Sequence, residues 1–131
     1  IRDKLDISFC SIGGVNNLKT NDVLGHEESI CCKFDLDKSP AIVGVKEKKL
    51  RFSNDNIFDY GFIIKLQPKS LQNRTWIAIA GLGEWGTSGA AWYLGRNWKV
   101  IEKIYGEKPF GLIIKVRGGK DESAQLVYRS V

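Results

Sequence analysis

Short apolar runs alternate with polar, glycine-containing segments in the N-terminal part of the chain. Residues 5–12 (LDISFCSI) are rich in strand-forming side chains, and Gly13 and Gly14 follow directly. This pattern predicts a buried strand that ends in a tight loop. Residues 16–24 predict a short helix, because three aliphatic side chains can share one face, and residues 29–34 (SICCKF) predict a second strand. We therefore expect a β-loop-α-β unit here.

The middle of the chain is typical of β structure. Residues 41–45 and 48–52 are short β-prone runs separated by a charged turn, which predicts a hairpin or an insertion at the margin of a sheet. Residues 59–66 and 75–80 are stronger apolar runs, joined by a polar connection that contains Pro68. Because the connection is short, we expect these two strands to be antiparallel neighbours.

Helical spacing of apolar residues begins only after a glycine-rich stretch at residues 81–89. Residues 90–94 and 98–105 each fit a short helix, and Gly95 between them predicts a helix stop. Pro109 ends the second helix, and residues 110–116 and 124–128 predict two strands joined by a glycine turn. The C-terminal half is therefore predicted to be β-α-α-β-β.

Two units of this kind predict an α/β fold. We expect a Rossmann-like or flavodoxin-like three-layer sandwich, whose mixed sheet has parallel strands at its centre and antiparallel strands at its edges. The 131 residues are enough for one hydrophobic core but not for two, so residues 1–131 are predicted to form a single domain. The 43% hydrophobic and 27% charged residues are ordinary for an ordered globular chain.

The distribution of charged and apolar residues argues against nucleic acid and membranes as partners. The net charge is +5, but lysines and arginines are scattered, and Glu47 interrupts their densest cluster. Nucleic-acid binders gather positive charge on one face, so this pattern argues against nucleic-acid contact by this domain. The chain has no apolar run near the roughly 20 residues of a membrane span, so no membrane contact is expected.

Cysteine and histidine usage argues against metal binding and disulfides. Cys10, Cys31 and Cys32 lack zinc-ligand spacing, and His26 is the single histidine. Reduced thiols of this kind are typical of a cytoplasmic protein. The chain contains no methionine, so we expect it to be a segment of a longer polypeptide, with the remainder of that polypeptide as a partner.

A glycine motif offers the clearest candidate for binding. Residues 81–86 (GLGEWG) match G-x-G-x-x-G between a strand-like and a helix-like run. A dinucleotide fingerprint also requires an acidic residue about 20 positions later, at the end of the next strand, and that strand ends instead in Lys115-Val116-Arg117. Hydride transfer is therefore disfavoured, although backbone N–H groups at such a loop still attract anions.

Gly13 and Gly14 form a second strand-to-loop turn of the same type. If the two strands are neighbours, both loops line one cleft, which would hold a nucleotide or another small anionic ligand; no cofactor can be named. The predicted ligand-binding residues are Gly13, Gly14, Asn16, Asn17, Gly81, Gly83, Glu84, Gly86 and Thr87. The competing interpretation is that these glycines only permit positive φ angles and close packing.

Catalytic patterns are sparse, so whether the chain is an enzyme stays open. Asp59 and Glu84 could form a carboxylate pair, provided that the directions of their strands bring them to one end of the sheet. One alternative function is a nucleoside- or NAD-cleaving enzyme that uses Glu84. Another is a protein–protein interaction domain without a ligand, whose surface is formed by Trp85, Trp92 and Trp98.

Three segments together resemble a prokaryotic domain. They are Gly13-Gly14 with Asn17 and Thr20, the segment Asp59-Tyr60-Gly61-Phe62-Ile63, and Ile79-Ala80-Gly81-Leu82-Gly83 followed by Gly86-Thr87, Ala90-Ala91 and Leu94. The chain resembles an α/β accessory domain found toward the C-terminal side of some bacterial helix-turn-helix or defence-type multidomain proteins, although Val15 stands where proline is expected. The resemblance implies an accessory sensor or effector module and does not name its ligand. Together with the two glycine loops, it leads us to expect a module of a larger protein that binds a small ligand or nucleotide.

Overall fold

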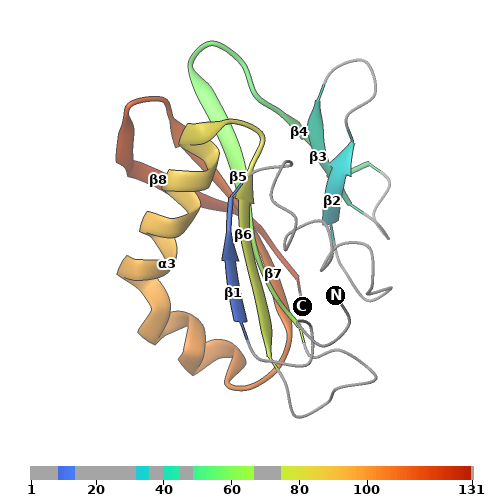
Figure 1. Cartoon of the computed structure of the whole chain (residues 1–131), viewed down its shortest axis with the longest axis vertical. Helices are drawn as coiled ribbons and strands as arrows, with labels where there is room; N and C mark the ends of the chain where they lie inside the picture. The colour runs from blue at the N-terminus through green and yellow to red at the C-terminus, as the bar shows by residue number, and fades with distance from the viewer. Residues whose placement is uncertain (1–8, 14–31, 36–39, 45–48, 67–74, 131) are drawn as a thin grey trace.

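Two sheets and one long helix form three layers. The computed structural model describes residues 9–13, 32–35, 40–44, 49–66 and 75–130. Their elements are β1 (Phe9–Ile12), β2 (Cys32–Asp35), β3 (Ala41–Gly44), β4 (Arg51–Ser53), β5 (Phe58–Leu66), β6 (Trp76–Gly81), α3 (Glu84–Tyr105), β7 (Phe110–Arg117) and β8 (Lys120–Arg129). A five-stranded sheet has the order β1-β6-β5-β7-β8, and a three-stranded sheet has the order β2-β3-β4. Helix α3 covers one face of the larger sheet and the smaller sheet lies over the other (Figure 1).

The centre of the five-stranded sheet is antiparallel. Strand β5 pairs antiparallel with both β6 and β7, and β7 pairs antiparallel with β8. A parallel pair, β1 with β6, lies at the edge. The predicted Rossmann-like or flavodoxin-like α/β sandwich with a parallel centre is therefore wrong. Helix α3 does join two strands of the same direction, β6 and β7, but β5 lies between them and pairs with both.

The local predictions in the middle of the chain are confirmed, but their assignment to one sheet is wrong. Strands β5 and β6 are antiparallel neighbours as predicted, and β3 and β4 form the predicted antiparallel pair. These last two strands join β2 in the separate sheet, so β2 does not continue the sheet of β1. The helix predicted at residues 16–24 lies outside the described residues.

Helix α3 is continuous, which corrects the prediction of two short helices. Gly95 lies inside it, and a Cβ atom at this position would meet open space. Glycine in a helix interior costs about 1 kcal/mol relative to alanine, which the rest of a long, packed helix can offset. The helix ends at Gly106, whose φ of 59° favours glycine. Within the described ranges, no helix combines the length and apolar character needed to cross a membrane.

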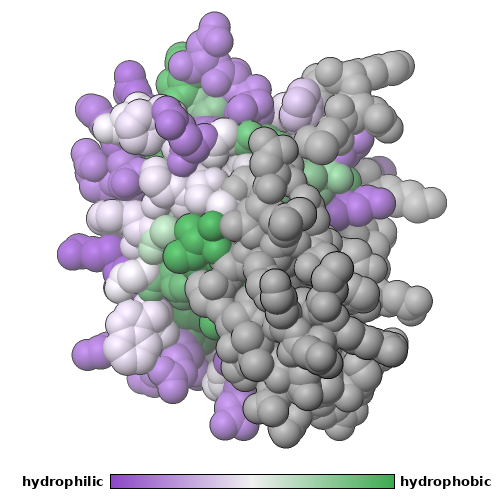
Figure 2. Space-filling view, in the orientation of Figure 1, coloured by the Kyte–Doolittle hydropathy of each residue, from purple (hydrophilic) through white to green (hydrophobic). Residues whose placement is uncertain are grey.

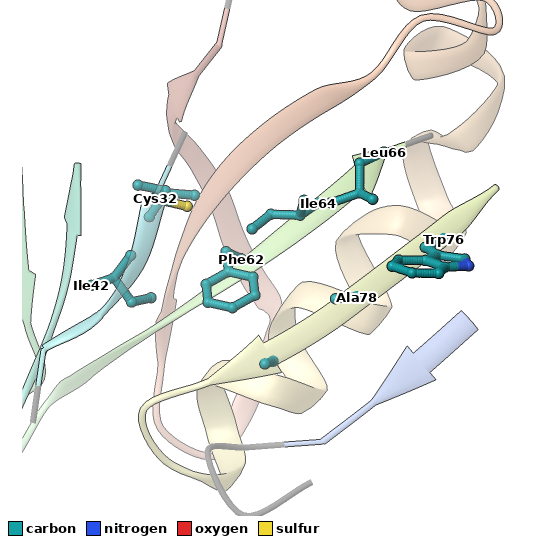
Figure 3. Close-up of a cluster of buried hydrophobic side chains, with 9 residues drawn as sticks. Cys32, Ile42, Phe62, Ile64, Leu66, Trp76 and Ala78 are labelled. Atoms are coloured by element: carbon teal, nitrogen blue, oxygen red, sulfur yellow. The ribbon is translucent and has the colours of Figure 1, made fainter. Parts of the chain in front are cut away.

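Side chains from both faces of the five-stranded sheet are buried. One cluster, which includes Phe62 of β5, packs between this sheet and the residues Cys32 and Ile42 of the smaller sheet (Figure 3). The other cluster includes Ile63 of β5 and packs against Ala90 and Ile101 of α3. This burial on two sides explains why β5, β6 and β7 are nearly continuous apolar runs rather than alternating ones.

Candidate functional site

The first turn of α3 lies against β5 and receives its capping group from that strand. Gly83 occupies the N-cap position and provides no side chain to accept hydrogen bonds from the first turn. The buried carboxylate of Asp59 does so instead: Oδ2 accepts the Gly86 N–H at 2.7 Å, and Oδ1 accepts the Tyr60 N–H at 2.8 Å. Negative charge is stabilised at a helix N-terminus. The chain thus supplies its own anion to the turn where an anionic ligand was predicted.

Close packing by itself requires three glycines around this turn. A Cβ atom on Gly86 would collide with the carbonyl oxygen of Tyr60, and one on Gly61 would collide with the carbonyl oxygen of Gly86. A Cβ atom on Gly81 would collide with the backbone of Gly86 and Thr87. The helix therefore approaches β5 more closely than any larger residue at these positions would allow.

A surface depression of about 530 Å³ opens beside this contact, and we call it the α3 groove. It is lined by residues 54–59, which are the β4–β5 loop and the start of β5, by Gly83, Glu84 and Trp85, and by Gly118 of the β7–β8 turn. Backbone hydrogen bonding joins the loop to the turn, since the Gly118 N–H donates to the Ile57 carbonyl oxygen at 2.9 Å. Three separate parts of the chain therefore meet at this groove.

The α3 groove is acidic and partly apolar. Asp55, Asp59 and Glu84 are among its lining residues, and no lysine or arginine is. Hydrogen bonds from the backbone N–H groups of Phe58 and Ile57 hold the pKa of Asp55 below its usual value of 3.8, with a smaller contribution from the charge of Lys115. Asp55 is therefore ionised at neutral pH.

Trp85 and Ile57 are exposed apolar residues that line the α3 groove. Trp85 is 41% exposed, and Ile57 is exposed as well. The Nε1 and Cδ1 atoms of Trp85 lie near the backbone of Gly118, so the ring extends from α3 toward the β7–β8 turn. A flat apolar ring beside carboxylates provides two complementary kinds of contact for a small molecule.

The predicted residues of the glycine motif separate into two groups. Gly83 and Glu84 line the α3 groove. Gly81 and Gly86 are buried in the contact with β5 and β6, and Thr87 is half-buried with its Oγ1 donating to the Gly83 carbonyl oxygen at 3.3 Å. The second group therefore has a structural explanation that does not involve a ligand.

The predicted residues of the first glycine loop lie elsewhere. Strand β1 runs parallel to β6, and the Gly13 N–H donates to the Ile79 carbonyl oxygen at 2.8 Å. The two strands are thus neighbours, as the shared-cleft hypothesis required, but Gly13 does not line the α3 groove. Gly14, Asn16 and Asn17 lie outside the described residues.

Sequence reasoning missed the β4–β5 loop as part of a site. Asn54, Asp55 and Asn56 lie between two β-prone runs, and such a polar run is a strong turn signal. In the structure, Asp55 Oδ1 accepts two backbone N–H groups of its own loop, as turn-forming aspartates do. The turn could therefore have been predicted, but not its position beside α3.

The fold brings Asp59 and Glu84 to the same groove, but the oxygens of Asp59 are already bonded to backbone N–H groups. Because β5 and β6 are antiparallel, Asp59 and Glu84 lie at the same end of the sheet and both line the groove. Each oxygen of Asp59 accepts a backbone N–H, so this group is committed to holding α3 in place. The arrangement does not favour acid–base chemistry by the pair.

The tryptophans differ in their surroundings. Trp76 is buried in the core between the sheets, whereas Trp85 and Trp98 are 41% and 50% exposed. Trp92 is half-buried, with the Arg96 guanidinium 5.6 Å from its ring centroid. Exposed tryptophans on α3 are thus available for contact with other molecules.

No group of three or more His, Cys, Asp or Glu side chains in the described ranges could hold a metal ion. Comparisons with protein-family models, curated proteins and solved structures find no match to the chain. The case for a functional site here therefore depends on the geometry of the groove alone.

Proposed function

We propose that the chain is a ligand-binding module of sensor or effector type, and that its ligand is a small organic cation bound in the α3 groove. The observation that supports this proposal is that one groove is lined by Trp85, whose side chain is 41% exposed, and by the acidic residues Asp55 and Glu84. A cation over an indole face is attracted by the ring, and carboxylates accept charge-assisted hydrogen bonds from ammonium or guanidinium groups.

The same geometry disfavours a phosphate group in this groove. A nucleotide would bring negative charge next to Asp55, Asp59 and Glu84, and like charges repel. The Gly86 N–H at the start of α3 is already bonded to Asp59. We therefore propose a small organic cation in place of the nucleotide or small anion that the sequence predicted.

Thermal unfolding with named probes tests the proposal. Spermidine, L-argininamide and glucosamine carry the expected charge, and ATP and NAD serve as phosphate-bearing comparators. A ligand that binds the folded state raises the Tm in a dose-dependent way. We expect at least one cationic probe to raise the Tm and neither nucleotide to do so.

Matched variants localise the effect. Glu84→Gln and Trp85→Ala should abolish the rise in Tm, measured from the Tm of each variant without probe. Glu84→Gln should leave that starting Tm nearly unchanged because Glu84 is exposed, whereas Trp85→Ala should lower it because more than half of the indole is buried. Glu102→Gln removes the same charge from an exposed position of α3 that does not line the groove, and it should keep the full response. The proposal fails if no cationic probe raises the Tm, or if Glu84→Gln and Trp85→Ala respond like the unmodified chain.

A second candidate function is that of a protein-interaction module. Trp98 is 50% exposed on α3, and Val100 and Ile104 on the same helix are more than half exposed. Val100 and Ile104 are four positions apart and share one side of the helix, whereas Trp98 lies on a different side. Exposed large apolar side chains are typical of interaction surfaces where they form a patch. Hydrophobic surface is also visible between α3 and the β1 edge of the sheet (Figure 2). Acrylamide quenching of Trp98 fluorescence that decreases on complex formation would support this candidate; quenching that never changes would contradict it.

A further inference from the structure

The second half of α3 has an exposed surface that is both apolar and basic. Arg96, Val100, Lys103 and Ile104 are all exposed, and the two aliphatic side chains are 58% and 54% exposed. These residues follow one another at intervals of four, three and one positions, which places them on one side of the helix. We call these four residues the α3 flank.

The α3 flank lies on the side of the helix that is directed toward β7 and β8. Gly89 packs against the side chain of Val116 of β7. Arg96 and Lys103 follow Gly89 by two and four helical turns, so they lie on the same side of α3 as that contact. Beyond β7, the sheet ends at the edge strand β8.

A third cation lies near the C-terminal end of the α3 flank. The Tyr105 hydroxyl donates to the Ser130 carbonyl oxygen at 3.0 Å, so the end of β8 is beside the last turn of α3. Arg129, the residue before Ser130, is exposed and pairs with Leu112, whose side chain belongs to the cluster under α3. Paired residues share a face of the sheet, so Arg129 lies on the helix face.

Acidic residues of α3 lie away from the flank. Glu102 is two positions from both Val100 and Ile104, so it is on another side of the helix. Glu84, in the acidic α3 groove, is separated from Val100 by about 24 Å along the helix, several times the Debye length of about 8 Å. The cations of the flank therefore keep their attraction for an anionic partner.

We propose that the α3 flank binds the surface of an anionic phospholipid bilayer, with the helix lying along the headgroups. Arginine and lysine side chains pair with phosphate and carboxylate groups of the lipids, while the neighbouring aliphatic side chains contact the acyl boundary. The net charge of +5 adds a long-range attraction. This mode of contact does not require the apolar run of a membrane span, because the helix does not cross the bilayer.

The shape and size of the flank favour a lipid surface over a protein partner. Helix α3 forms a convex ridge on the outside of the sheet (Figure 1). A stable protein interface buries about 800 Å² on each partner around a well-packed apolar centre, which two exposed aliphatic side chains do not supply. A fluid bilayer accommodates a convex ridge without a surface of matching shape.

Vesicle co-sedimentation tests the proposal. The probes are vesicles of phosphatidylcholine alone and of phosphatidylcholine mixed with phosphatidylserine. We expect the 131-residue chain to sediment with the mixed vesicles at low salt, less at high salt, and not with phosphatidylcholine alone. Arg96→Gln and Lys103→Gln each remove one cation, so each should weaken binding about fivefold. Val100→Gln and Ile104→Gln should also weaken it, because they remove the apolar contact.

A matched control lies on the other sheet. Lys33 of β2 is exposed, and its sheet lies over the face of the five-stranded sheet opposite α3 (Figure 1). Lys33→Gln removes the same charge as Lys103→Gln, but it should change binding by less than about twofold. All substituted side chains are exposed, so the Tm without vesicles should be similar for every variant.

Three results would overturn the proposal. The first is that the chain does not sediment with the mixed vesicles. The second is that Lys33→Gln weakens binding as much as Lys103→Gln, which would mean that net charge alone drives binding. The third is that Val100→Gln and Ile104→Gln bind like the unmodified chain. Binding to poly-L-glutamate without binding to vesicles would assign the flank to an acidic protein and would overturn the lipid proposal as well.

Discussion

The inner and outer sides of residues 81–89 have different roles within one short segment. On the inner side, Gly81 and Gly86 leave no room for a Cβ atom against β5 and their own turn. On the outer side, Glu84 and Trp85 are exposed and line the α3 groove. Glycine spacing alone therefore does not distinguish a ligand loop from a packing contact. The neighbouring chain decides between them, here through Asp59 and the Tyr60 carbonyl oxygen.

The largest expected effect is a loss of stability when alanine replaces Gly86, which is tightly packed, and it is compared with the same substitution at Gly95, which faces open space on the same helix. In Gly86→Ala, the added methyl group meets the Tyr60 carbonyl oxygen, so α3 or β5 must shift, and the free energy of unfolding should fall by about 3 kcal/mol. In Gly95→Ala, the methyl group meets open space, and the helix should gain about 0.5–1 kcal/mol. Urea unfolding measures both changes. Equal effects of the two substitutions would contradict the inner-side assignment.

The next largest effect concerns the carboxylate that holds the two elements together. Asp59→Ala leaves the N–H groups of Gly86 and Tyr60 without their acceptor, and we expect a loss of about 2 kcal/mol in the free energy of unfolding. Asp59→Asn keeps one acceptor oxygen and should lose less. Amide hydrogen exchange at Gly86 should accelerate in Asp59→Ala. Unchanged protection of that amide would show that Asp59 does not cap α3.

A smaller effect is expected at Gly83, which lines the α3 groove and also lies against the carboxylate of Asp59. A Cβ atom on Gly83 would lie 2.6 Å from Asp59 Oδ2, so Gly83→Ala should displace this carboxylate and cost about 1 kcal/mol. In the Asp59→Ala background the obstacle is gone, and the loss should disappear. A double-mutant cycle by urea unfolding measures this coupling. Additive losses would mean that Gly83 acts independently of Asp59.

The smallest expected effect is a pH dependence on the outer side. Because backbone N–H groups lower the pKa of Asp55 in the folded chain, its stabilisation is present above the unfolded value of about 3.8 and is lost as the pH falls through the lower folded pKa. The carboxyl signal of Asp55 in an NMR titration should therefore move below pH 3.8. In Asp55→Asn, this part of the acid destabilisation should be missing. A titration midpoint at or above the usual value would contradict the loop geometry.

Apolar patterns were sufficient to find the strands β5, β6 and β7, because burial on both faces makes each of them an uninterrupted apolar run. The same patterns could not reveal that β5 lies between β6 and β7, since pairing partners are set by long-range contacts. Gly95 was overestimated as a helix stop, because its cost is small compared with the stabilisation of a packed helix.

Only part of the candidate site could be predicted. Gly83 and Glu84 follow from the glycine motif, and the polar run at residues 54–56 signals a turn. Nothing local relates that turn to Trp85 or to Gly118, which are 29 or more positions from Asn56. The charge of the groove, and with it the class of ligand, becomes visible only when these segments are placed together.

By itself, the sequence determined the apolar runs that become strands, the antiparallel pairing of β5 with β6, and the close glycine turn before α3. These features depend on side-chain periodicity and on connections of a few residues, which are local properties of the chain. The tertiary structure decided the antiparallel centre of the sheet, the capping of α3 by Asp59 and the acidic groove. These features depend on which distant segments become neighbours. The packing of the whole core determines those contacts, and no single segment does.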